Sequence, residues 1–177
     1  SGISLEFWLD KNGFIAADES DRQIICDLWN NGTWGNADYG RFRVELSGTA
    51  TGEMPPNFHI ELLSGSSGFT SGQISDPNPT LIMSASSLTG SWNHFALTFE
   101  NHGTSMSGQL YQNGNLVYSI NTGSTMGIIS GPMMGQIGSL IAPVSGNQGA
   151  RSFGLLSASL DEVRFWKTRR TAQQIGM

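Results

Sequence analysis

The sequence has a single cysteine, Cys26, so no disulfide can form within the chain. Cys26 lies in the apolar run from Ile24 to Leu28, where a small buried core residue is expected rather than a reactive thiol. The length of 177 residues is most simply one domain that can bury a substantial core.

Charged residues are scarce as well. They make up 13% of the chain, the net charge is −5, and no basic tract occurs. These features argue against a nucleic-acid surface and against a surface for anionic membranes. No stretch is long or apolar enough to cross a membrane. Low charge with many hydroxyl and amide side chains is common in extracellular and virion surface proteins.

The common catalytic motifs are also missing. The sequence contains no Gly-x-Ser-x-Gly elbow and no glycine-rich phosphate loop. The three histidines, His59, His94 and His102, lack the spacing of a metal-ligand set. The sequence therefore gives no positive sign of an enzyme.

The residues that are abundant predict an all-β fold. The chain has 23 glycines with many Ser, Thr and Asn residues, which suits short strands joined by turns. Roughly ten strands are expected, which fits an antiparallel sandwich. The expected strands include 3–9, 23–29, 41–46, 57–63, 80–83, 134–137 and 154–166. We expect residues 64–79 to form a surface loop, 167–177 to form one helical turn or a tail, and no helix to exceed two turns.

The stretch from Ser91 to Tyr118 predicts three consecutive antiparallel strands. Phe95, Leu97 and Phe99 alternate with polar or small residues, which puts them on one face of a strand. Asn113-Gly114 then supplies the two positive-φ residues of a type I′ hairpin turn.

This stretch also carries a family resemblance. Trp92-Asn93-His94-Phe95-Ala96-Leu97-Thr98, then Leu110-Tyr111-Gln112-Asn113-Gly114, resembles the laminin-G-like, concanavalin-A-like jelly rolls. Residues 4–9 and the closing Leu160-Asp161-Glu162-Val163-Arg164-Phe165-Trp166 fit the same family in the same order. The resemblance implies a two-sheet antiparallel β-sandwich. We expect residues 1–177 to form one such domain of a longer polypeptide.

Side-chain positions follow from these strands. Trp8, Trp92 and Trp166 fall in the family-like strands, and we expect them in the core. In the strand from 41 to 46, Arg41, Arg43 and Glu45 alternate with apolar residues, so we expect a half-exposed strand.

The resemblance alone does not decide function, because this fold carries lectins, adhesins, hydrolases and structural modules. Its glycosidases place two carboxylates on one strand face, often as Glu-x-Asp-x-x-Glu, and no such spacing occurs here. Asp161 and Glu162 are adjacent and point to opposite sides of a strand. We therefore expect a non-catalytic module.

The family resemblance makes a calcium site possible. In some relatives the position of Asp161 faces such a site, and Asp27 is another possible oxygen donor. The alternative is that Asp161 accepts hydrogen bonds from backbone N–H groups while Glu162 pairs with Arg164. Because the sequence lacks a dense acidic loop, we favour the alternative.

The segment from Asn30 to Tyr39 has the composition of a saccharide site. Such a site needs an aromatic platform for the C–H face of a sugar ring beside short polar groups for its hydroxyls. The alternative is that the tryptophan of this loop folds over the sheet edge or packs against a neighbouring domain. The candidate ligand-binding residues are Asn31, Trp34, Asn36, Asp38 and Tyr39.

The stretch from Met126 to Val144 is rich in Met and Ile. An exposed patch of this kind usually marks a protein contact, with Met126, Met133 and Met134 as the candidate residues. The alternative is a loop that covers one end of the sandwich.

The function expected from these observations is non-catalytic binding of a glycan, such as a cell-surface polysaccharide, or of a partner protein. The parent protein would be an adhesin, a secreted protein or a virion surface protein. A structural assembly module without a small ligand is the second hypothesis, and a glycan-cleaving enzyme is the third.

Overall fold

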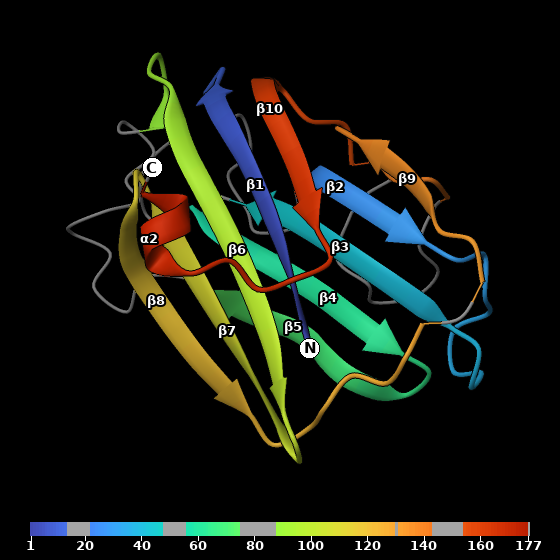
Figure 1. The fold of residues 1–177 in the computed structure, drawn as a ribbon. Helices are drawn as coiled ribbons and strands as arrows, with labels where there is room; N and C mark the ends of the chain where they lie inside the picture. The colour runs from blue at the N-terminus through green and yellow to red at the C-terminus, as the bar shows by residue number, and fades with distance from the viewer. Residues whose placement is uncertain (14–21, 48–55, 75–87, 130, 143–153, 177) are drawn as a thin grey trace.

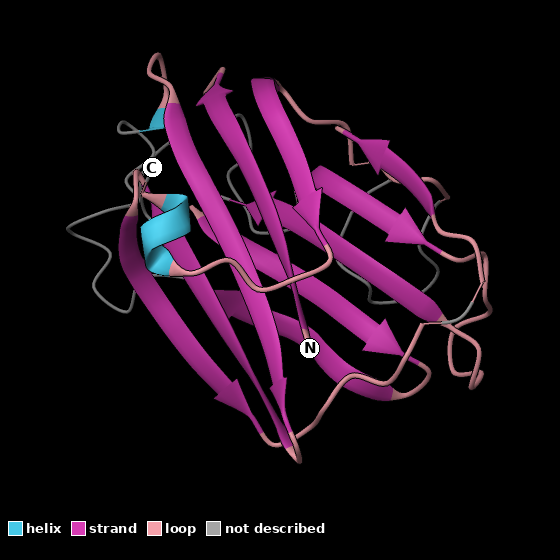
Figure 2. Cartoon of the chain, viewed as in Figure 1, coloured by secondary structure: helices cyan, strands magenta, loops and turns pink. Residues whose placement is uncertain are grey.

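The structure is a computed structural model that describes residues 1–13, 22–47, 56–74, 88–129, 131–142 and 154–176. Within these residues the chain forms ten β-strands and one short helix, arranged as two antiparallel sheets (Figures 1 and 2). The predicted all-β sandwich is therefore confirmed.

Each sheet has five strands. Sheet A has the order β10-β1-β6-β7-β8, and sheet B has the order β5-β4-β3-β2-β9. The strands of sheet A are β10 (Ala158–Trp166), β1 (Gly2–Lys11), β6 (Asn93–His102), β7 (Ser105–Gln112) and β8 (Asn115–Thr122). Those of sheet B are β5 (Ser67–Ile74), β4 (Asn57–Ser64), β3 (Gly40–Ser47), β2 (Gln23–Trp29) and β9 (Met134–Ile137).

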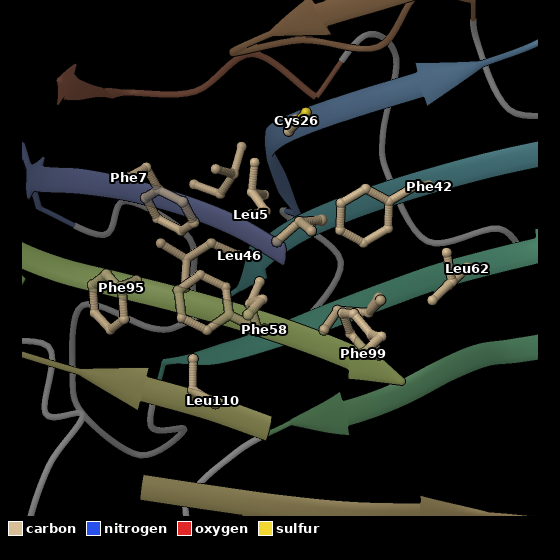
Figure 3. Packing of buried hydrophobic residues seen from close by; sticks show 14 of the residues in the cluster. Leu5, Phe7, Cys26, Phe42, Leu46, Phe58, Leu62, Phe95, Phe99 and Leu110 are labelled. Carbon is tan, nitrogen blue, oxygen red and sulfur yellow. The ribbon is translucent and has the colours of Figure 1, made fainter. Parts of the chain in front are cut away.

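The core lies between the two sheets and follows the two-residue period of the strands. Phe95, Leu97 and Phe99 on β6 are all buried, as the alternation predicts. Figure 3 shows Phe95 and Phe99 in the core. They meet side chains from sheet B, such as Phe58, whose ring lies 5.1 Å from that of Phe95 in an edge-on contact. Both sheets thus bury their inward residues against each other.

The predicted hairpin tip and the predicted helical turn are also present. Asn113 (φ 50°) and Gly114 (φ 80°) connect β7 to β8. The helix α2 spans Ala172–Ile175, and Thr171 caps it together with Gln174. The described residues contain no helix long and apolar enough to cross a membrane.

The C-terminal segment crosses the outer face of sheet A before it reaches α2 (Figure 1). The Ser4 hydroxyl donates to the Thr168 carbonyl at 2.9 Å. The Arg170 guanidinium donates to Glu6 Oε2 at 2.8 Å. These contacts fasten the segment to β1, so the outer face of sheet A is partly covered.

The expected loop at 64–79 is wrong in its central part, because residues 67–74 form the edge strand β5. Gly65 (φ 63°) makes the turn from β4, and Gly68 (φ 129°) lies where a Cβ would meet the Leu62 carbonyl oxygen at 2.2 Å. An edge strand can form through backbone pairing with a single neighbour. The Ser- and Gly-rich sequence of β5 therefore needs no alternating apolar pattern, and without that pattern the strand was not predicted. The expected strand at 80–83 lies outside the described residues.

The expectation that Trp8, Trp92 and Trp166 are core residues is wrong. Trp92 is 48% exposed and Trp166 is 37% exposed. Trp8 lies between the inward-facing Phe7 and Leu9, so the two-residue period turns it to the outer face of sheet A. Trp92 precedes β6, so no strand pairing directs it inward.

Leu97 provides a direct test of the core assignment. Leu97 is fully buried, and Leu97→Ala should lower the free energy of unfolding by about 2–5 kcal/mol because it removes buried apolar groups and leaves a cavity. Leu116 is 51% exposed, so Leu116→Ala should change it by less than about 1 kcal/mol. Urea unfolding of both variants measures the difference; equal losses would contradict the assignment.

Candidate functional site

The loop between β2 and β3 is held in shape mainly by the side chain of Asn30, while the Trp29 indole N–H also donates to the Gly32 carbonyl at 3.0 Å. Asn30 Oδ1 accepts hydrogen bonds from the backbone N–H groups of Gly32 at 3.0 Å and Gly40 at 2.9 Å. Its Nδ2 donates to the Asp38 carbonyl at 2.6 Å. A Cβ on Gly32 would lie 2.8 Å from the Tyr39 Cα, so the two ends of the loop approach closely. The loop is therefore tied to the sheet at its base.

Trp34 stands at the outer part of this loop and is 55% exposed. Its ring meets the Tyr39 ring in an edge-on contact, with centroids 5.6 Å apart and an interplanar angle of 84°. The edge-on geometry leaves much of the indole open to solvent while one side is supported. An exposed, supported indole is what a stacking platform requires.

Tyr39 is an anchor of the loop. It is buried, and its hydroxyl donates to Glu61 Oε1 at 2.5 Å. Burial and the neighbouring Glu61 raise the pKa of Tyr39, so the phenol stays protonated. The Tyr39 carbonyl accepts from Gly65 N–H at 2.6 Å, which joins the loop to the β4–β5 turn.

The remaining predicted ligand-binding residues, Asn31, Asn36 and Asp38, are exposed. Asn31 has a positive φ of 61°, a conformation that Asn tolerates better than most residues. The Asn36 backbone accepts from Tyr39 N–H at 3.1 Å and donates to the Thr33 carbonyl at 3.0 Å. Three exposed polar residues thus lie on the same loop as the exposed indole.

Asp27, a predicted calcium donor, lies on β2 in an ion pair. Arg41 donates from Nε to Oδ1 at 2.8 Å and from Nη2 to Oδ2 at 2.7 Å. The Ile141 N–H donates to Oδ2 at 3.0 Å. Asp27 is fully buried, so its carboxylate charge is already matched by a guanidinium.

The outer face of sheet B continues this network, and the expected half-exposure of β3 is wrong. All eight residues of β3 are buried. Arg43 contacts Glu45 at 2.6 Å and Glu61 at 3.0 Å. The segment after β9 turns back over part of this face, where Leu140 is 1% exposed. Sequence alternation alone could not show that cover.

The structure also brings together a serine and a histidine that the sequence did not suggest as a pair. Ser47 Oγ lies 2.7 Å from His59 Nε2, and both residues are buried. Burial, with a smaller effect of Arg22, lowers the pKa of His59 to about 4. A buried imidazole of such low basicity is a poor general base at neutral pH, so this pair lacks the features of a catalytic dyad.

Asp161, the other predicted calcium donor, lies on β10 of sheet A and is not near Asp27 in the fold. Its Oδ1 accepts from the Glu162 N–H at 2.7 Å, and Glu162 pairs with Arg164 at 3.1 Å. These contacts are the alternative that the sequence favoured. In the parts of the chain that the structure describes, no three His, Cys, Asp or Glu residues form a metal-binding group.

The methionine-rich segment is partly buried and partly exposed. Met126 is partly buried against the core, and its backbone N–H and carbonyl both bond to the Asn101 side chain, at 3.1 and 2.8 Å. Met133 is 39% exposed and Met134 is 43% exposed. Met126 and Met133 contribute to the wall of an apolar pocket of about 850 Å³ that also reaches Phe42 between the sheets.

Two packed antiparallel sheets of five strands each define the class of antiparallel β-sandwiches. The chain belongs to the concanavalin A-like lectin/glucanases superfamily, whose laminin-G-type model matches residues 2–176. The family resemblance read from the sequence is therefore confirmed. A comparison with curated protein sequences finds no match.

Solved structures with a similar fold come from several organisms. A Bacteroides ovatus protein to which carbohydrate binding has been ascribed is 18% identical with a TM-score of 0.57, and the match covers 99% of this chain and 40% of that one. A Limulus polyphemus SAP-like pentraxin is 15% identical with a TM-score of 0.60, and the match covers 99% of this chain and 68% of that one. The CBM40 module of a Ruminococcus gnavus IT-sialidase is 14% identical with a TM-score of 0.52, and the match covers 98% of this chain and 80% of that one. At these identities the similarities show the fold alone.

The lowered pKa of His59 predicts a pH dependence of stability. Between pH 6.5 and about 4 the unfolded chain binds a proton at this residue and the folded chain does not, so acid destabilises the fold. From pH 7 to 4, the wild type should lose about 3 kcal/mol more unfolding free energy than His59→Gln. Urea unfolding across this range measures the difference. His102→Gln, at an exposed site, should keep the wild-type slope; a wild-type slope in His59→Gln would contradict the prediction.

We also predict that the melting temperature is nearly the same in EDTA and in millimolar calcium. The reason is that Arg41 and backbone N–H groups already engage Asp27 and Asp161. A native calcium site at 100 times its Kd would add about 2.7 kcal/mol to the unfolding free energy. A calorimetric shift of that size would contradict the prediction and make Asp161 the first residue to replace.

Proposed function

We propose that the chain is a non-catalytic carbohydrate-binding domain and that the loop from Asn30 to Tyr39 is its saccharide site. The observation that carries the proposal is the exposure of Trp34 on a loop tied at its base by Asn30. A pyranose presents an apolar C–H face and a rim of hydroxyls, which match an indole surrounded by short polar groups.

The comparisons support the class of ligand. The family includes lectins as well as glucanases. The CBM40 module is also known with α2,6-sialyllactose bound, in a structure with a TM-score of 0.50 to this chain. A parent protein at a cell surface, outside a cell or on a virion would bring such a domain to its glycan.

The non-catalytic part of the proposal rests on the charges that the structure describes. The carboxylates of sheet B are paired with arginines, as in the Asp27–Arg41 and Glu61–Arg43 contacts. A glycosidase needs one carboxyl group free to donate a proton and a second one to act as nucleophile or base. Buried carboxylates held by guanidiniums do not meet that need.

A structural assembly module is the second candidate function. Exposed apolar side chains on β9 and at the end of β10 favour it, since patches of this kind commonly mark protein contacts. These side chains are Met134, Ile137, Phe165 and Trp166. In this case the domain would contact other subunits and need no small ligand.

Replacement of Trp34 separates the two functions. Trp34→Ala should weaken binding to a glycan by at least about tenfold, because the stacking platform is lost. Its melting temperature should change little, because the indole is 55% exposed. A glycan array followed by titration with lactose and α2,6-sialyllactose measures binding, and calorimetry measures stability.

Trp92→Ala is the matched control, because Trp92 is 48% exposed and lies outside the loop. This variant should bind as the wild type does. Unchanged binding by Trp34→Ala would place the ligand elsewhere. A large fall in its melting temperature would instead show that Trp34 is a structural residue.

A further inference from the structure

A second concave surface lies on the outer face of sheet A, away from the Trp34 loop. It is a pocket of about 470 Å³, within the range of sites for small ligands, roughly 300–1,000 Å³. Strands β1, β6 and β10 form its floor, and α2 borders it. We call it the sheet A pocket, and its principal side chains are Glu6, Trp8, His94, Glu162, Arg164 and Arg170.

The floor of the pocket is aromatic. Trp8 and His94 are directly opposed in the β1–β6 register, and their rings lie 5.2 Å apart. Both are partly exposed. Burial and the charges of Arg164 and Arg170 lower the pKa of His94, so its imidazole is neutral at pH 7 and offers one donor and one acceptor. An apolar ring face can lie on this floor beside a hydrogen-bonding group.

The rim of the pocket carries two ion pairs, Arg164–Glu162 at 3.1 Å and Arg170–Glu6 at 2.8 Å. Glu162 and Arg164 are each about half exposed, so they can turn toward a ligand. The two carboxylates balance the two guanidiniums. The pocket therefore offers adjacent donors and acceptors without an excess of charge.

Two local irregularities occur in this pocket. Glu162 has a positive φ of 47°, unusual for Glu, at a shift in the β1–β10 register beside Trp8. Such bulges often re-aim a side chain next to a functional site. Oε1 of Glu6 is buried and accepts no hydrogen bond from the described residues. Burial outweighs the neighbouring arginines and raises the pKa of Glu6. An unpaired buried acceptor calls for a donor.

We propose that the sheet A pocket is a second saccharide-binding site, which takes a neutral pyranose with its C–H face on Trp8 and His94 and its hydroxyls on the Glu162–Arg164 pair. The assignment of saccharide as the ligand rests on the proposed function, while the residues are different ones. Because the charges balance, the site does not require an acidic sugar.

Residue-resolved NMR tests the two sites separately. Lactose is titrated to about 10 mM while the His94 ring and the Trp8 and Trp34 indole signals are followed. The His94 and Trp8 signals should shift and saturate together. In Arg164→Ala the apparent Kd from these two signals should rise at least about tenfold. Trp34→Ala should leave their titration unchanged.

Arg169→Ala is the matched control, because Arg169 pairs with Glu100 on the same sheet and does not line the pocket. It should titrate as the wild type does. An unshifted His94 signal, or a shift that Arg164→Ala does not weaken, would overturn the proposal. A His94 response to α2,6-sialyllactose alone would also overturn it, since the ligand would then be recognised through its carboxylate.

The outcomes distinguish this inference from the proposed function. If the Trp34 signal shifts and the His94 signal does not, the loop binds sugar and the pocket does not. If only His94 and Trp8 shift, the pocket is a site and the loop is not. A lack of response at all three signals would contradict both proposals.

Discussion

The contact among Phe7, Phe58 and Phe95 is the interaction on which the sandwich depends. The Phe58 ring lies edge-on to both others, at 6.1 Å from Phe7 and 5.1 Å from Phe95, so it joins sheet B to two strands of sheet A. Once these rings are buried, the two-residue period fixes which neighbours face outward. Trp8 and His94 lie outside because Phe7 and Phe95 lie inside. The outer surfaces are thus set by the core.

Much of this arrangement could be predicted from sequence, because alternation and turn chemistry are local. The inward face of β6 and the Asn113-Gly114 turn follow from neighbouring residues alone. The sequence left two positions open for Trp34, and the structure shows it 55% exposed. The edge strand β5 could not be predicted, because its Ser- and Gly-rich backbone forms pairs without an alternating apolar pattern in the sequence. The prediction for Trp8 is wrong because strand membership alone does not imply burial, and Phe7 and Leu9 on either side of it occupy the inward face.

The polar contacts that join residues distant in the chain, such as Arg41–Asp27 and Arg170–Glu6, could not be predicted. Arg43 is buried in ion pairs with Glu45 on its own strand and with Glu61 on the neighbouring strand, and strand alternation does not encode this burial. The pocket on sheet A combines residues from position 6 to position 176. Buried ion pairs of this kind contribute little net stability, because desolvation offsets much of their attraction. That residues 1–177 form one domain of a longer polypeptide stays a prediction.

The position of β1 between β6 and β10 has a consequence for synthesis on the ribosome. β1 leaves the ribosome first of the described strands, yet one of its edges pairs only with β10, the last of them. Until β10 emerges, the edge of β1 that β10 covers in the folded domain is unpaired, and an unpaired edge is a template for pairing with other chains. The cost of closing so long a loop also delays this pairing. The edge of β1 therefore stays open to other chains until the last described strand has been synthesised.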